Sequence, residues 1–241
     1  VTGTIFARLL GFNPKEIEQG LYGFSPALVG VALFVFLKPD PLTWLLLPVG
    51  SVLAAWIQHF FLRKNIPVFT LPFVLVTWGI VYGIPQLFPD LTLTPAAVNL
   101  TTGNDFTTAF RAFGQVIFQE KPVSGLLFFA GVWINQPLAA LAALASACIT
   151  SLMAAYFLIP SASIEEGLFG YNAVLCAIAF TGYRKSDGAW IALSVLLSGL
   201  LSIFMWEYQL IQLTFPFVIA SMLVFYLRLR SKPILNSPQS E

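Results

Sequence analysis

A block of sixteen residues near the start of the chain returns in its second half, and this duplication limits the possible folds more than any other feature. "EQGLYGFSPALVGVAL" occupies 18–33, and "EEGLFGYNAVLCAIAF" occupies 165–180, 147 positions later. A second pair follows in the same order, 144 positions apart: "FTLPFV" at 69–74 and "LTFPFV" at 213–218. Two matches at nearly the same spacing predict a duplicated structural unit.

Composition places this unit in a membrane. Hydrophobic residues make up 58% of the chain and charged residues 10%, against about 45–50% and about 25% in soluble domains. Apolar runs of about 15–22 residues lie at 42–61, 73–88, 138–159, 189–206 and 215–229. A helix needs roughly 20 residues to cross hydrocarbon, so the shorter runs indicate broken or re-entrant pieces. We predict an all-α membrane protein whose transmembrane helices and re-entrant half-helices form two repeats.

The basic residues predict how these repeats are oriented. If 106–118 enters the membrane and returns to the same side, eight of the twelve basic residues share one face: Lys15, Arg63, Lys64, Arg184, Lys185, Arg228, Arg230 and Lys232. The opposite face receives only Lys38, Arg111 and Lys121. The positive-inside rule makes the first face, with the C-terminus, cytoplasmic. The two copies of the repeated block then lie on opposite faces, which makes the repeats inverted.

Aligning the copies predicts the domain boundaries. The first repeat covers 1–105, and the second covers 106–241 with a cytoplasmic C-terminal tail. Fifty-nine residues, 106–164, precede Glu165, but only 17 precede Glu18. We therefore expect the first repeat to lack roughly 40 N-terminal residues of the complete unit.

Few side chains could support catalysis. The single histidine, His59, has no cysteine or carboxylate neighbours in its apolar run and is expected to be interfacial rather than a ligand or base. The carboxylates fall at segment ends, which argues against a buried proton or ion relay. Cys148 and Cys176 lie in apolar runs, where thiols usually pack. We predict no catalytic residue, no metal site, no cofactor and no disulfide, and we disfavour a membrane-embedded enzyme.

Two threonines are candidates for solute contact. Thr70 and Thr214 each precede a proline that suits the first turn of a helix. Inverted symmetry would bring the two helix starts together near the midplane. Their hydroxyls could bind a small, polar, uncharged solute, or they could simply cap the helices.

The repeated aromatic residues also have two possible roles. Phe24 and Tyr171 are each followed one helical turn later by leucine, at Leu28 and Leu175. These residues either belong to the core or form two matched apolar walls.

Five stretches taken together resemble the urea transporter family of bacteria and animals. In chain order they are "GLYGF" at 20–24, "IPVFTLPF" at 66–73, "FGQVIFQEKPVSGLLF" at 113–128, "EEGLFGYNAVL" at 165–175 and "LTFPF" at 213–217. They cover both repeats in the order that the family has them.

The resemblance implies a passive, channel-like path for urea across the plasma (inner) membrane, along the pseudo-twofold axis. Two aromatic slots would flank a threonine-lined constriction, and the protein would be a homotrimer among membrane lipids with one pore in each subunit. It assigns the pore to Phe24, Leu28, Thr70, Gln115, Val116, Phe118, Tyr171, Leu175 and Thr214. The first-repeat counterparts of Gln115, Val116 and Phe118 would fall in the segment that the first repeat lacks.

Two alternatives stay open at this point. The pore could serve another small neutral solute, such as a short amide, ammonia or water, or the chain could be a truncated relative that does not conduct. Ions are expected to be excluded, because no charged ring offsets their desolvation cost of several kcal/mol. No nucleic-acid partner is expected.

Overall fold

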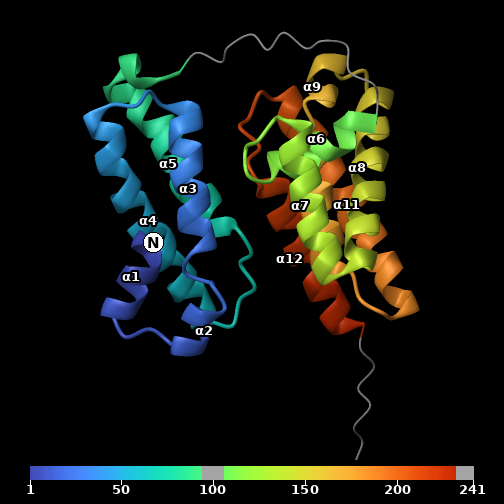
Figure 1. The fold of residues 1–241 in the computed structure, drawn as a ribbon, viewed down its shortest axis with the longest axis horizontal. Coiled ribbons are helices and arrows are strands. Elements are labelled where there is room, and N and C mark those ends of the chain that lie inside the picture. Colours follow the sequence, from blue (N-terminus) through green and yellow to red (C-terminus); the bar gives the residue numbers. More distant parts are fainter. Residues whose placement is uncertain (94–105, 232–241) are drawn as a thin grey trace, which may run out of the picture.

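The computed structural model describes residues 1–93 and 106–231, which form two helical groups side by side (Figure 1). The first group contains α1 (Thr2–Leu9), α2 (Pro14–Glu18), α3 (Phe24–Phe36), α4 (Pro41–Leu62), α5 (Leu71–Leu87) and the 3-10 turn η1 (Pro89–Leu91). The second contains α6 (Phe106–Gln115), α7 (Pro122–Asn135), α8 (Pro137–Tyr156), α9 (Ser161–Glu165), α10 (Tyr171–Phe180), α11 (Lys185–Glu207) and α12 (Phe215–Arg230). The all-α prediction is confirmed, and the described residues add one isolated β-bridge, Leu37–Thr92.

The backbone repeats as the sequence does. Left-handed φ angles recur in pairs 147 or 144 residues apart: Gly11 (66°) and Leu158 (59°), Gly20 (76°) and Gly167 (80°), Asn65 (53°) and Gln209 (54°), Phe69 (48°) and Leu213 (44°). L-residues seldom adopt such angles. The copies therefore share their turns as well as their helices.

Helix starts follow from proline and aspartate. Proline occupies the first turn of α4, α5, α7, α8 and α12, where its missing N–H leaves no hydrogen bond unmade. The Asp40 carboxylate accepts a hydrogen bond from the Leu42 N–H at 2.9 Å before α4. Asp187, 147 positions later, accepts one from the Arg184 N–H at 3.1 Å before α11. The two aspartates act from different positions, because Asp40 is the N-cap of α4 whereas Asp187 is the third residue of α11.

Three helices of the described chain are long and apolar enough to cross a membrane: α4, α8 and α11. Their outward side chains are also apolar, as Trp44 on α4, Leu152 on α8 and Leu200 on α11 show with exposures of 60%, 72% and 49%. Such surfaces are stable against lipid rather than water. The chain is therefore an integral membrane protein.

The two groups meet through the starts of α5 and α12. The core of the first group, built around Val29, Leu33 and Phe73, includes Leu213 of the second. Aromatic pairs cross the same boundary, with ring centroids 4.9 Å apart for Trp78 and Phe215 and 5.3 Å apart for Phe69 and Phe217. The boundary is therefore packed on either side of the two threonine turns.

Helix α6 is held by small residues on its neighbours. A Cβ atom at Gly125 of α7 would overlap the carbonyl oxygen of Phe110, and one at Gly167 would overlap the Ala112 nitrogen. Only glycine allows this approach, and at Gly167 the left-handed φ of 80° also favours it. The last turn of α6, with Gln115, is thereby fixed against the start of the second repeated block.

Candidate functional site

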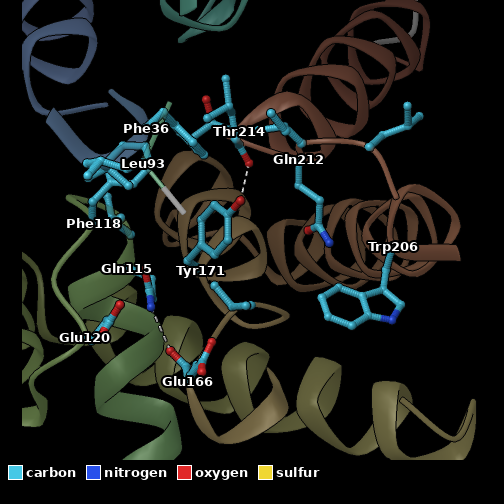
Figure 2. A pocket seen from close by; sticks show the side chains of 16 residues that line it. Phe36, Leu93, Gln115, Phe118, Glu120, Glu166, Tyr171, Trp206, Gln212 and Thr214 are labelled. Carbon is cyan, nitrogen blue, oxygen red and sulfur yellow. Dashed lines mark hydrogen bonds between the residues drawn. The ribbon is translucent and has the colours of Figure 1, made fainter. Parts of the chain in front are cut away.

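A cavity of about 620 Å³ lies between the two helical groups, and Figure 2 shows it from close by. Val35, Phe36 and Leu93 line it from the first group. The second group contributes the end of α6, the starts of the second repeated block and of α12, and the connection between α11 and α12. The cavity thus joins segments that are far apart in the sequence.

Five of the nine residues assigned to the pore from the sequence line this cavity: Gln115, Val116, Phe118, Tyr171 and Thr214. A sixth, Thr70, reaches it through Thr214. The other three do not line it. Phe24 is half-buried at the start of α3, Leu28 packs against the core of the first group, and Leu175 packs in the cores of the second.

The two predicted threonines contact each other directly. Their Oγ1 atoms are 2.6 Å apart, and the residues are only 8% and 3% exposed for Thr70 and Thr214. Each occupies the N-cap position of its helix with nearly the same backbone angles, yet neither side chain makes a capping hydrogen bond. One hydroxyl donates to the other, so the accepting threonine keeps its own proton. The pair can therefore still donate one hydrogen bond and accept others.

Tyr171 and Asn172 fix the turn before α12. The Tyr171 hydroxyl donates to the Leu213 carbonyl, and the Asn172 amide donates to the same oxygen at 3.2 Å. The Asn172 carbonyl in turn accepts from the Phe217 N–H at 3.2 Å. This network holds the turn that carries Thr214, which lines the cavity.

A polar rim forms where Gln115, Glu120 and Glu166 gather (Figure 2). The Gln115 side-chain nitrogen donates to the Glu166 carbonyl oxygen at 3.0 Å. Burial raises the pKa of the Glu166 carboxyl, the nearby Glu120 carboxylate raises it further, and Arg111 acts in the opposite direction. Among the lining residues only these two glutamates carry a carboxyl group.

Sequence reasoning missed several lining residues, among them Phe36, Trp206 and Gln212. From the ends of α3 and α10 onward the two halves match at an offset of 144, which pairs Phe36 with Phe180, Trp206 with Leu62 and Gln212 with Val68. A search for repeated residues therefore passes over Trp206 and Gln212, and Phe36 lies beyond the repeated block 18–33. The one available signal for Gln212 is its place two residues before Thr214.

His59 has side-chain neighbours, and they come from outside its own apolar run. Its ring stacks on Phe12 with centroids 3.6 Å apart, and its Nδ1 lies 2.9 Å from the Tyr22 hydroxyl. Tyr22 also bonds the Glu16 carboxylate at 2.5 Å. Burial and this carboxylate raise the pKa of Tyr22, so the phenol stays protonated. The carboxylate comes near only because the connection between α2 and α3 folds against α4.

Comparison with known proteins relates this sequence to one protein family. The sequence profile of the family described as "Urea transporter" matches residues 1–229. Proteins called Urea transporter 1 from Rattus norvegicus and Mus musculus are each 27% identical over 199 residues, which is 76% of this chain and 52% of the relative. The protein of that name from Ovis aries is 26% identical over the same coverage. The chain spans about half the length of the curated relatives it matches.

Proposed function

The chain belongs to the urea transporter family, and on that premise we propose that it conducts urea passively through the cavity and past the Thr70–Thr214 pair. The observation that carries the proposal is the 2.6 Å contact between two threonine hydroxyls, each at the start of a helix and one lining the cavity. The rat and mouse relatives bear the name urea transporter.

Urea suits the chemistry of this cavity. It is flat, neutral and dipolar, with one carbonyl acceptor and four N–H donors along its edges. Phe36, Phe118 and Tyr171 offer aromatic surface to its faces. The threonine pair and the Gln115 amide offer hydrogen bonds to its edges. Each edge group left without a partner on dehydration would cost about 1–3 kcal/mol, so these polar groups lower the barrier.

The same lining disfavours ions. Glu120 and Glu166 lie at the rim with Gln115, whereas the residues deeper in the cavity are neutral. An ion that left water would lose several kcal/mol of hydration without a fixed counter-charge to replace it. We propose that transport needs no proton or sodium gradient.

We also propose that the two groups are inverted repeats. Helix α2 lies at the lower end of the first group, and its counterpart α9 lies at the upper end of the second (Figure 1). Helices α3 and α10 contain 13 and 10 residues, which rise about 20 and 15 Å. Because a membrane core is about 30 Å thick, these lengths support re-entrant half-helices.

Orientation and assembly complete the proposal. The basic residues favour a cytoplasmic C-terminus, and we propose a homotrimer in the plasma (inner) membrane, surrounded by lipid, with one path in each subunit. Single cysteines near Lys185 and near Asp90, in a Cys148→Ser background, would test the topology with a membrane-impermeant maleimide. Labelling of both positions from the same side of intact cells would rule out the inverted arrangement.

Reconstitution tests the transport itself. Liposomes containing the chain should equilibrate urea faster than protein-free liposomes, as followed by stopped-flow light scattering. The rate should not change when a proton or sodium gradient is imposed. Urea flux equal to that of protein-free liposomes would refute the proposal. Faster flux of water or ammonia than of urea would favour a different neutral solute.

A further inference from the structure

We infer that Gln212 binds the solute, with its side-chain oxygen accepting a hydrogen bond from an N–H group as the solute approaches the threonine pair. The inference rests on the proposed function and adds a contact that repeat symmetry does not give. Gln212 lies in the connection between α11 and α12 and lines the cavity. Its Oε1 atom is buried, yet no described residue donates to it.

The backbone around Gln212 is held on both sides. The Ile211 carbonyl accepts from the Trp78 indole at 2.8 Å, and the Ile211 N–H donates to the Tyr82 hydroxyl at 3.0 Å. On the other side, the Leu213 carbonyl accepts from Tyr171 and Asn172. The connection is therefore fixed without any help from the Gln212 side chain.

The Gln212 side chain points into the cavity. Figure 2 shows its amide between the rings of Tyr171 and Trp206, on the same connection as Thr214. The Gln212 main-chain carbonyl already accepts from the Phe215 N–H at 3.1 Å, so the residue is held while its amide stays unpaired. Held at its backbone, and with an unpaired amide that can turn toward the cavity, Gln212 offers an acceptor to a ligand that brings N–H groups.

The chemical class that fits is a small neutral molecule with N–H donors on its edge, such as urea or a short primary amide. The acceptor meets an N–H edge while the aromatic rings contact the flat face. At the matching position in the first half stands Val68, which is 2% exposed and apolar. We therefore place this contact on one side of the threonine pair only.

A substitution series tests the inference in the reconstituted chain. Gln212→Met keeps a side chain of similar length and removes the amide. We expect the half-saturating urea concentration to rise about tenfold, which is the worth of one hydrogen bond, with an unchanged unfolding midpoint. Gln212→Asn keeps the amide and moves it back by one methylene, so a smaller rise of about threefold is expected. If Gln212→Met does not fold, the half-saturating concentration of Gln212→Asn tests the inference on its own.

The chain offers a matched control. Gln58 on α4 is also buried, 3% exposed, with an Oε1 atom that no described residue donates to, but it does not line the cavity. Gln58→Met should leave the half-saturating concentration unchanged.

The outcomes separate the two claims. If the parent conducts urea and the folded Gln212 variants match it, the inference is wrong and the proposed function stands. If the half-saturating urea concentration rises equally in Gln212→Met, Gln212→Asn and Gln58→Met, the effect comes from general packing and the inference is also wrong. A parent without urea flux refutes both.

Discussion

The two threonine turns have the same backbone but different side-chain support. Phe69 and Leu213 share left-handed φ angles of 48° and 44° directly before Thr70 and Thr214. In the second half, Tyr171 and Asn172 both donate to the turn. Their counterparts are Phe24, which lacks a hydroxyl, and Ser25, whose buried Oγ has no partner among the described residues. Equal backbone geometry therefore does not require equal hydrogen bonding.

The different support of the two turns shows that side chains can diverge between the repeats while the backbone stays the same. The first turn is packed by apolar contacts, with Val68 buried in the position of Gln212. The second turn is held by hydrogen bonds from Tyr171 and Asn172, so it can border a cavity without apolar side chains packed against it on that side. The turn before Thr70 is thus part of the apolar core, whereas the turn before Thr214 borders the cavity.

A second pair of regions differs in the opposite sense. Tyr22 of the first half corresponds to Phe169 of the second, and each contacts a ring near the end of the following long helix, His59 on α4 and Trp206 on α11. The first pair is hydrogen-bonded and linked to Glu16, whereas the second is an edge-to-face aromatic contact with centroids 5.6 Å apart. Here the first half is polar and the second apolar, so neither half is uniformly the polar one.

Removing a hydroxyl from the threonine pair should give the largest effect. Thr214→Val keeps the side-chain volume but leaves the solute and Thr70 one hydrogen bond short, a barrier increase of about 1–3 kcal/mol. At about 1.4 kcal/mol per tenfold change in rate, urea flux should fall by about tenfold or more. Thr70→Val should act similarly, because both hydroxyls serve one pair.

The control for this prediction is Thr43→Val. Thr43 is also buried, but its hydroxyl donates to the Lys38 carbonyl at 2.8 Å and it does not line the cavity. It should lose stability and keep its flux per folded protein. Parental flux in both folded Thr70 and Thr214 variants would mean that the pair does not form the constriction.

Tyr22→Phe should lower stability by about 1–3 kcal/mol. The change installs the residue of the second half and leaves both the Glu16 carboxylate and His59 without their shared partner. Thermal unfolding in detergent would measure the loss, with Tyr183→Phe, an 89% exposed tyrosine, as control. The double variant Tyr22→Phe/His59→Trp, which imitates the aromatic contact of Phe169 with Trp206, should recover part of it. No loss in the single variant would show that the hydrogen bonds add nothing to packing.

Tyr171→Phe should have a smaller effect, about 1 kcal/mol of stability. The Leu213 carbonyl keeps its hydrogen bond from Asn172, so no buried acceptor is orphaned. Flux should fall by a few-fold, because the turn that carries Thr214 is less firmly held. Tyr208→Phe, at a 64% exposed position, serves as control. A flux loss as large as that of Thr214→Val would place Tyr171 in the constriction itself.

Glu166→Gln should give the smallest change, and its sign depends on pH. The raised pKa of the Glu166 carboxyl means that the fold disfavours its ionised form. Its contribution to stability is therefore full below the ordinary glutamate pKa and is lost as the pH rises through the folded value. Glu166→Gln should raise the unfolding midpoint slightly at pH 8 and leave it nearly unchanged at pH 4. Stabilisation only at pH 4 would reverse the inferred electrostatics.

Much of the fold could be predicted because its signals are local. Proline and aspartate mark the starts of α4, α5 and α12, and the apolar runs give the long helices. The repeated blocks also predicted that Thr70 and Thr214 stand at equivalent helix starts. Their hydroxyl contact follows from symmetry that can be inferred from the sequence, although its 2.6 Å length cannot.

The unrepeated parts of the site could not be found in this way. Gln212 and Trp206 are matched in the first half by the unlike residues Val68 and Leu62, and Phe36 lies beyond the repeated block of its helix. Phe24, Leu28 and Leu175 do repeat, yet the packing directs them away from the cavity lining. Repetition identifies what both halves need for folding, and the lining depends on what each half has changed.

The sequence by itself determined the membrane environment, the helices and the duplication, because hydrophobicity, helix starts and glycine turns act over a few neighbouring residues. Only the tertiary structure decided which polar groups find partners. Glu16, Tyr22 and His59 form one hydrogen-bonded group although they span 43 positions of the sequence. Trp78 and Tyr82 form hydrogen bonds with the Ile211 backbone, which lies about 130 positions later. A hydrogen bond needs its two atoms within about 3 Å, and that closeness arises only when distant segments pack, within the first half for Glu16, Tyr22 and His59 and between the halves for Ile211.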